Sequence, residues 1–170
     1  MGQPQSKPRL PKPGDHIYCE RKGGLYDHHG IYMGDGMVIH LRGAAKKLGE
    51  LPGCHKCGDK RVENGEIAKV CIDCFLDGGM IQIFDYGVPL LEFIARKRVI
   101  SIATDLLERN DFGPYDMFTN NSQHFAVYCK TGFATSFQIE GHIPAGMLAG
   151  AAVVATFGVT KGVSKTSSSW

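Results

Sequence analysis

The sequence has little net charge, no internal repeat and, over most of its length, no long run of apolar residues. Its 170 residues carry 19 Lys and Arg against 17 Asp and Glu, a formal net charge of +2. This balance argues against a nucleic-acid partner, which calls for a marked excess of positive charge. A length of 170 residues and a hydrophobic fraction of 43% are ordinary for one globular domain with a sizeable core.

A secretory signal peptide is also missing from the start of the chain. The first residues, MGQPQSKPRLPKPGD, are polar and proline-rich, whereas a signal peptide needs an apolar stretch. We therefore expect an intracellular protein, cytoplasmic or at a membrane, whose cysteines are reduced or bind metal. Residues 1–12 are expected to be a flexible leader. Gly2 and Ser6 also fit an N-myristoylation signal, so an acylated N-terminus is the alternative.

The pattern of apolar residues predicts strands early in the chain and helices later. Residues 16–21 alternate loosely, and residues 29–41 read as a β-hairpin whose Gly-Asp-Gly turn supplies the positive φ of tight hairpins. Residues 42–79 show neither period and are predicted to be loop. A further strand is expected at residues 80–87. Helices are predicted at residues 89–96, from residue 99 to a stop signal at Asn110, and at residues 122–131.

The one long uncharged stretch covers residues 143–160. Its length lies at the lower limit of the roughly 20 residues that a helix needs to cross a bilayer. Gly146 and Gly150 have the Gly-x-x-x-Gly spacing of close helix contacts. We expect residues 136–170 to form a small-residue hydrophobic segment, which either packs against protein or enters a bilayer.

Four cysteines form the pattern C-x2-C-x13-C-x2-C, in which each pair can close a tight turn. They are Cys54, Cys57, Cys71 and Cys74. Four thiolates suit a tetrahedral, structural Zn²⁺ site, because no coordination position is left for water. Gly58 directly after the first pair fits the turn that brings amide hydrogens to the sulfurs. Two disulfides or four free thiols are the alternatives, and the paired spacing favours zinc.

Three histidines lie on the two strands of the predicted hairpin: His28, His29 and His40. Pairing across the turn places His40 near the other two. An imidazole beside a thiol or hydroxyl is the basic unit of nucleophilic catalysis, and a second polar group orients the first ring. Spacing alone does not bring this hairpin to a nucleophile, so ordinary strand histidines are the alternative.

Three motifs in order, PGDHIY, HHGIYMGDGMVIHL and NSQHFAVYCKTG, resemble the lecithin:retinol acyltransferase-type (LRAT, or NC) domain. The cysteine insert and YCKTG are similar to its plant members. The resemblance implies an α+β fold: an NlpC-like, permuted papain-like antiparallel sheet packed on helices, with an inserted zinc-binding loop. We expect this domain at residues 13–135, with the zinc loop at residues 52–76.

The resemblance also implies a site. In that family a histidine before the GIY motif is the base, a histidine in VIHL orients it, and a cysteine at a helix N-terminus is the nucleophile. Matched position by position, these are His28, His40 and Ser122. Family enzymes cleave acyl esters of phospholipids and transfer the acyl chain to water, an amine or an alcohol. The expected partners are therefore phospholipid or another acyl lipid and a membrane surface, and no nucleic acid.

Ser122 departs from the family pattern, because a hydroxyl is a far weaker acid than a thiol of pKa about 8.5. Ser122 is an N-cap, a slow nucleophile, or the mark of chemistry lost or engineered away; we rank loss or strong weakening first. We predict a weakened or inactive acyltransferase or phospholipase-like hydrolase, a pseudoenzyme. The alternative is a binding or scaffold protein that docks on a membrane or in a larger assembly. Gln123 and His124 are expected on the surface.

Overall fold

A computed structural model describes residues 9–43, 52–60, 65–86 and 89–134. Within them, one antiparallel sheet has the strand order β4-β3-β2-β1-β5. The strands are β1 His16–Arg21, β2 Tyr26–Gly34, β3 Met37–Leu41, β4 Ile67–Cys71 and β5 Gln82–Ile83. The helices are α1 Ile72–Leu76, α2 Pro89–Arg109 and α3 Ser122–Thr131. The predicted α+β class with an antiparallel sheet is confirmed.

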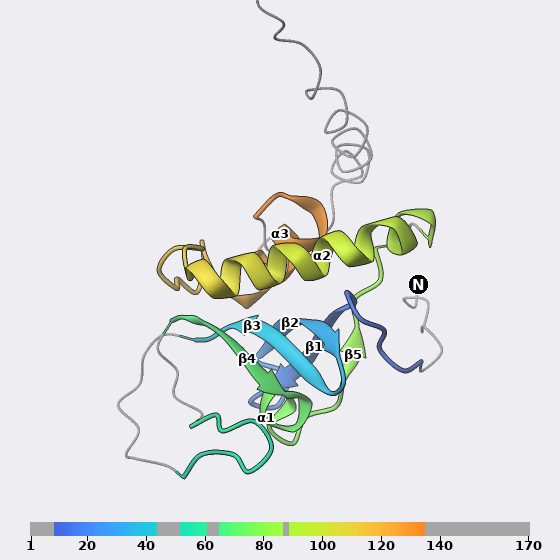
Figure 1. The fold of residues 1–170 in the computed structure, drawn as a ribbon. Helices are drawn as coiled ribbons and strands as arrows, with labels where there is room; N and C mark the ends of the chain where they lie inside the picture. The colour runs from blue at the N-terminus through green and yellow to red at the C-terminus, as the bar shows by residue number, and fades with distance from the viewer. Residues whose placement is uncertain (1–8, 44–51, 61–64, 87–88, 135–170) are drawn as a thin grey trace, which may run out of the picture.

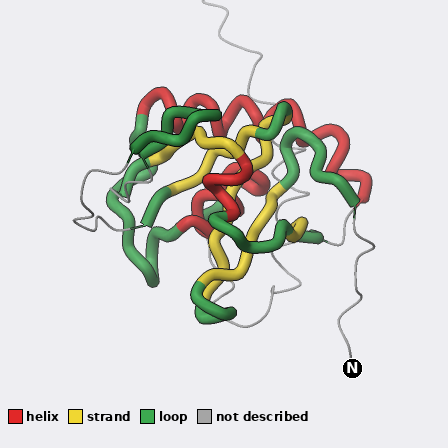
Figure 2. The backbone as a smooth tube through the Cα atoms, turned by 90° about the horizontal axis from the view of Figure 1, so that it is seen from below, coloured by secondary structure: helices red, strands yellow, loops and turns green. Residues whose placement is uncertain are grey.

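Period-2 alternation divides the core between the two faces of the sheet. On one face, Ile31 of β2 and Ile39 of β3 pack against α2 and α3, around a fully buried Phe125. On the other face, Val38 and its neighbours pack against Phe75 of α1. Figure 1 shows α2 and α3 above the sheet and α1 below it, and Figure 2 shows the strands from below. The sheet is therefore covered on both faces.

The predicted hairpin is the centre of the sheet. The turn residues Gly34, Asp35 and Gly36 all have positive φ, at 96°, 49° and 69°. The strands pair Gly34 with Met37 and, after a register shift between Tyr32 and Gly34, Tyr32 with Val38 and Ile31 with Ile39. Continued by one residue, the register of Ile31 with Ile39 sets Gly30 opposite His40.

The cysteine-bearing region holds more regular structure than the sequence predicts. Residues 42–79 were expected to be loop, but β4 and α1 lie within them. Four of the five residues of β4 are buried, and only Lys69 is exposed. A stretch of five residues is too short to show the alternation of apolar and polar residues that predicts a strand. The two helices predicted on either side of residue 97 are one continuous α2, because no Gly or Pro interrupts them.

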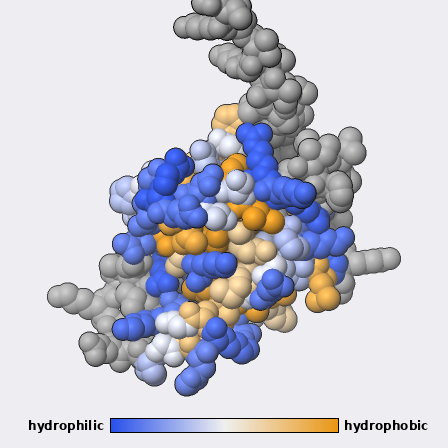
Figure 3. Space-filling view, in the orientation of Figure 1, coloured by the Kyte–Doolittle hydropathy of each residue, from blue (hydrophilic) through white to orange (hydrophobic). Residues whose placement is uncertain are grey.

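Apolar side chains gather in the middle of the face seen in Figure 3 and are rimmed by polar ones. None of the helices in the described ranges is long and apolar enough to cross a bilayer. The predicted C-terminal segment, residues 136–170, and the N-myristoylation site at Gly2 lie outside the described residues.

Candidate functional site

The start of α3 is fixed by a capping box on Asn121. Its side-chain oxygen accepts hydrogen bonds from the amides of Gln123 (2.9 Å) and His124 (3.2 Å), and His124 Nδ1 accepts from the Asn121 amide (3.2 Å). Ser122 is therefore the first helical residue, and its interpretation as the N-cap is wrong. Gln123 and His124 are 3% and 7% exposed, so the prediction that they lie on the surface is also wrong.

Replacing the cap should loosen the helix start that carries Ser122. Asn121→Ala is expected to lower the free energy of unfolding by about 1 kcal/mol, because two amides lose their acceptor. Asn121→Asp keeps that acceptor but loses the bond that Asn121 Nδ2 donates to the Met117 carbonyl oxygen, so it should lose less than Asn121→Ala. Urea unfolding followed by circular dichroism measures both variants, and equal losses would contradict the capping role.

The Ser122 hydroxyl meets the sheet at β2. Its Oγ accepts a hydrogen bond of 3.2 Å from the backbone amide of His29. The register of β2 with β3 continues from Ile31 and Ile39 towards His29 and Leu41, but that pair is not formed. The Ser122 hydroxyl thus accepts from the His29 amide in place of a backbone carbonyl of β3, at the point where β2 and β3 separate. Because the His29 nitrogen is bonded to the carbonyl carbon of His28, the hydroxyl lies beside the backbone of His28.

The rings of His28 and His40 form a hydrogen-bonded pair. His28 Nε2 lies 2.8 Å from His40 Nδ1, and the rings meet edge to face at 85°. Burial, with a smaller contribution from Arg21, lowers the pKa of His28 to about 3. Burial and then the charge of His28 hold the pKa of His40 well below its usual value of 6.5. Both rings are therefore neutral near pH 7, as a proton acceptor must be.

The pair can adopt two tautomers, and the second nitrogen of His40 is unpaired in both. His40 Nε2 is buried and has no hydrogen-bond partner among the described residues. If His28 donates through Nε2, its Nδ1 is free to accept a proton, but His40 Nε2 then carries an unpaired buried hydrogen, which costs about 1–3 kcal/mol. If His40 donates instead, His40 Nε2 is an unpaired buried acceptor, which carries a similar cost, and His28 Nδ1 is already protonated. His40 Nε2 is therefore unsatisfied in either tautomer.

A second histidine pair, which the sequence analysis did not predict, lies on the sheet face that α3 covers. His16 Nε2 lies 2.8 Å from His29 Nδ1, and His16 Nδ1 lies 2.8 Å from the Tyr86 hydroxyl. The His16 ring stacks on Phe84 at 4.7 Å. Alternation along residues 16–21 could have placed His16 on one face, but the register with β2 could not be read from the sequence.

The four predicted metal ligands come together. All four sulfur atoms lie within 4.8 Å of one another. Cys54 and Cys71 are 3.8 Å apart, as are Cys57 and Cys74. A tetrahedron with Zn–S bonds of about 2.3 Å has sulfur–sulfur edges of about 3.8 Å. The donor set therefore fits a tetrahedral metal ion.

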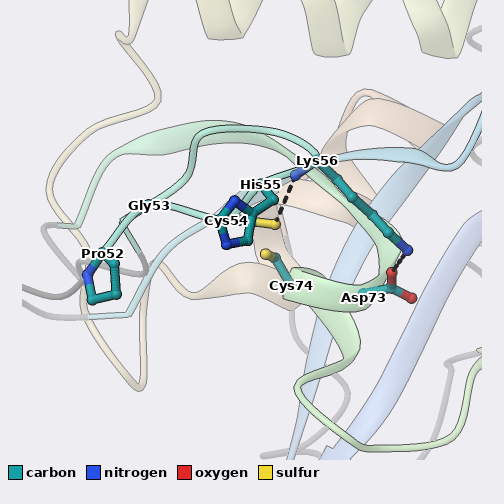
Figure 4. A pocket seen from close by; sticks show the side chains of 7 residues that line it. All are labelled: Pro52, Gly53, Cys54, His55, Lys56, Asp73 and Cys74. Atoms are coloured by element: carbon teal, nitrogen blue, oxygen red, sulfur yellow. Dashed lines mark hydrogen bonds and ion pairs between the residues drawn. The ribbon is translucent and has the colours of Figure 1, made fainter.

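The turn around the first cysteine pair supports its thiolate. Hydrogen bonds from the backbone amides of Cys57 and then Lys56 lower the pKa of the Cys54 thiol to about 6. Gly58 closes the turn with φ of 73° and donates to the Cys54 carbonyl oxygen at 2.7 Å. Figure 4 shows the Cys54 sulfur facing that of Cys74 beside a hollow that His55 also lines and that does not include His28, His40 or Ser122.

Comparison with known proteins covers most of the chain. LEAD-SENSITIVE 1 of Arabidopsis thaliana is 35% identical over 150 residues, which are 71% of this chain and 57% of that protein. Human phospholipase A and acyltransferase 2 is 26% identical over 154 residues, 88% of this chain and 91% of that protein. Rat lecithin retinol acyltransferase is 27% identical over 124 residues, which are 68% of this chain and 53% of that protein. The chain thus spans little more than half the length of two of these relatives.

The family model for lecithin retinol acyltransferase matches residues 9–135, a range that holds the sheet, the two histidine pairs, the cysteine cluster and Ser122. A match over this much of the chain identifies the family. This chain belongs to the lecithin retinol acyltransferase family.

Proposed function

We propose that residues 13–135 form an acyltransferase or phospholipase-like domain that binds acyl-lipid esters at the start of α3, with chemistry that Ser122 strongly weakens. The observation that carries the proposal is the hydrogen bond of 3.2 Å that holds the Ser122 hydroxyl against the His29 amide, beside the backbone of His28. The matching relatives include proteins named for phospholipase and acyltransferase activity, which supports an acyl-lipid substrate at a membrane surface.

In the proposed reaction the side-chain oxygen of Ser122 attacks the ester carbonyl carbon. The family motif assigns the base to His28, which accepts the hydroxyl proton through Nδ1 while His40 orients its ring. Because the His28 ring packs on Phe75, on the sheet face opposite α3, this step requires the ring to turn past the edge of β2 towards the hydroxyl. The new oxygen–carbon bond forms, the ester bond breaks, and the departing alcohol takes the proton from His28. Water or another acceptor then releases the acyl chain. Amides at the start of a helix favour the negative charge that develops on the carbonyl oxygen.

Two features make a serine poorly suited to this site. A hydroxyl must give up its proton during attack, and a base whose pKa is about 3 holds that proton weakly. A thiolate would raise the pKa of the neighbouring imidazole by its charge, whereas a neutral hydroxyl does not. We therefore infer that the site keeps its arrangement of residues and that its rate of acyl transfer is strongly reduced.

The experiment is fatty-acid release from short-chain phosphatidylcholine by the wild-type chain, Ser122→Cys and His28→Ala. Ser122→Cys should exceed the wild type by about 100-fold or more, because the site regains its thiolate and the geometry shaped for sulfur. The wild type should be close to His28→Ala. If Ser122→Cys is as inactive as His28→Ala, the acyl site is refuted and a non-catalytic binding or scaffold role takes its place.

We also propose that the cysteine cluster binds one structural Zn²⁺. Cys54 and Cys57 come from the turn that Gly58 closes, Cys71 ends β4 and Cys74 lies in α1. Four thiolates complete a tetrahedral ion and leave no position for water or substrate. When bound, the ion supplies a fixed charge that ties the turn to the edge of the sheet; it takes no part in the proposed acyl transfer.

A further inference from the structure

Phe75 lies between the cysteine cluster and the His28–His40 pair. Its side chain is fully buried, at 0% exposure, on the sheet face opposite α2 and α3. Its ring centroid is 5.2 Å from that of His28 at a tilt of 33°, and 5.6 Å from that of His40, edge-on at 83°. Phe75 is therefore one wall of the space that holds the two imidazoles.

The sheet is shaped to receive this ring. A Cβ atom at Gly30, two residues after His28, would lie 2.9 Å from Phe75 Cε2 and 2.8 Å from Val38 Cγ1, closer than real side chains approach. A glycine at this strand position allows the ring to lie directly on the β2 backbone. On this side the ring rests on a rigid surface, so α1 is the element that sets its position.

Helix α1 depends on contacts outside itself. It has only five residues, too few for a stable isolated helix, and Cys71 at its N-cap makes no side-chain capping bond. At its end, the Arg21 guanidinium donates hydrogen bonds to the carbonyl oxygens of Phe75 and Leu76. At its start lie Cys71 and Cys74, two of the four cluster sulfurs. The cluster therefore holds the turn that leads into Phe75.

We propose that Phe75 is a positioning residue for the His28–His40 pair, and that the metal bound by the cysteine cluster fixes α1 and so the Phe75 ring. This inference rests on the proposed function of both sites. Loss of the metal releases the first turn of α1, moves the ring and loosens the contact between the two histidines. The cluster thus sets how His28 is oriented without touching the substrate.

The test is the NMR spectrum of the imidazole nitrogens and ring protons of the full chain. In the zinc-loaded wild type, His28 and His40 should show one hydrogen-bonded tautomer, with His28 protons shifted by the Phe75 ring current. Phe75→Leu should lose that shift and Phe75→Tyr should keep it. Cys54→Ser breaks the cluster from outside α1 and should resemble Phe75→Leu. His55→Ala changes an exposed neighbour in the same turn and should resemble the wild type.

Unchanged histidine signals in a Cys54→Ser chain that has lost its zinc would overturn the inference. If that variant does not fold, chelation of the folded wild type provides the same comparison. If the wild type contains no zinc, the proposed role of the metal is refuted. The comparison of Phe75→Leu with Phe75→Tyr then still tests whether Phe75 positions the two histidines.

In the Ser122→Cys background, Phe75→Leu should lower kcat at least about tenfold with KM little changed, because misplacement of about 1 Å can cost about 100-fold. Phe75→Tyr should restore most of kcat, and an equal loss in both variants counts against positioning. Inactivity of Ser122→Cys itself refutes the proposed acyl site and leaves the NMR result to be judged separately.

Discussion

Acidification from about pH 7 to about pH 5 should cost the domain several kcal/mol of folding free energy. The cause is the set of buried neutral imidazoles in the two histidine pairs. Burial, followed by a neighbouring charge, lowers the pKa of both His28 and His29 from 6.5 to about 3. Burial also places the pKa of His16 and His40 well below 6.5. In the folded chain these rings therefore stay neutral over the whole interval.

The direction follows from proton binding. Below pH 6.5 the unfolded chain binds a proton at each of these histidines and the folded chain does not, so acid favours unfolding. Stability is full above pH 6.5 and is lost as the pH falls from 6.5 towards the folded pKa of about 3. Each such group contributes about 1.4 kcal/mol per pH unit. His29 is only 1% exposed and should contribute most of this loss of stability. His28 is partly exposed and should contribute somewhat less.

Urea unfolding at several pH values, with zinc content measured on the same samples, checks this prediction. Zinc content matters because protonated thiols release metal in acid. A free energy of unfolding that stays flat between about pH 7 and about pH 5 in zinc-retaining protein would show that the imidazoles are not buried and neutral.

Removal of zinc should lower the melting temperature by about 10 °C. A ligand held at about 1,000 times its Kd stabilises by about 4 kcal/mol, and about 2–4 °C is lost per kcal/mol in a domain of this size. The loss should extend beyond the cysteine turn, because Cys71 ends β4 and Cys74 lies in α1, whose Phe75 is part of the core. The cluster thus connects an edge strand, a short helix and a turn.

Calorimetry of the full chain with and without a chelator measures the change, and metal analysis should find one zinc per chain. Added zinc should restore the melting temperature. Cys54→Ser should melt near the chelated wild type and should not respond to chelator. A folded wild type with much less than one zinc per chain, or with a melting temperature that chelation leaves unchanged, would refute the zinc site.

The sequence predicted the local features of the fold well. The hairpin turn, the paired cysteines and the helix that Gly132 closes each depend on a few neighbouring residues. Such features are set by turn chemistry, ligand spacing and capping, which can be read without knowing the rest of the chain. The bulge that pairs Gly34 with Met37 was missed, because a shift of one residue leaves no mark on the alternation.

The features that depend on distant contacts could not be predicted. The His16–His29 pair needs the register of β1 against β2, and its third member, Tyr86, comes from a segment far along the chain. Strand β4 and α1 lie in a stretch predicted to be loop, because β4 depends on pairing with β3 and α1 on burying its own Phe75 in the core. Asn121 and Ser122 are both good N-cap residues, and only the hydrogen bonds show which of them serves.

The most direct measurement of the central claim is the intact mass of Ser122→Cys after incubation with phosphatidylcholine. The structure places position 122 at the first residue of α3, against β2 and next to the backbone of His28. The account predicts one acyl chain bound as a thioester at position 122, and none in the variant that also carries His28→Ala. No acyl adduct in Ser122→Cys, or an equal adduct in the double variant, would contradict it.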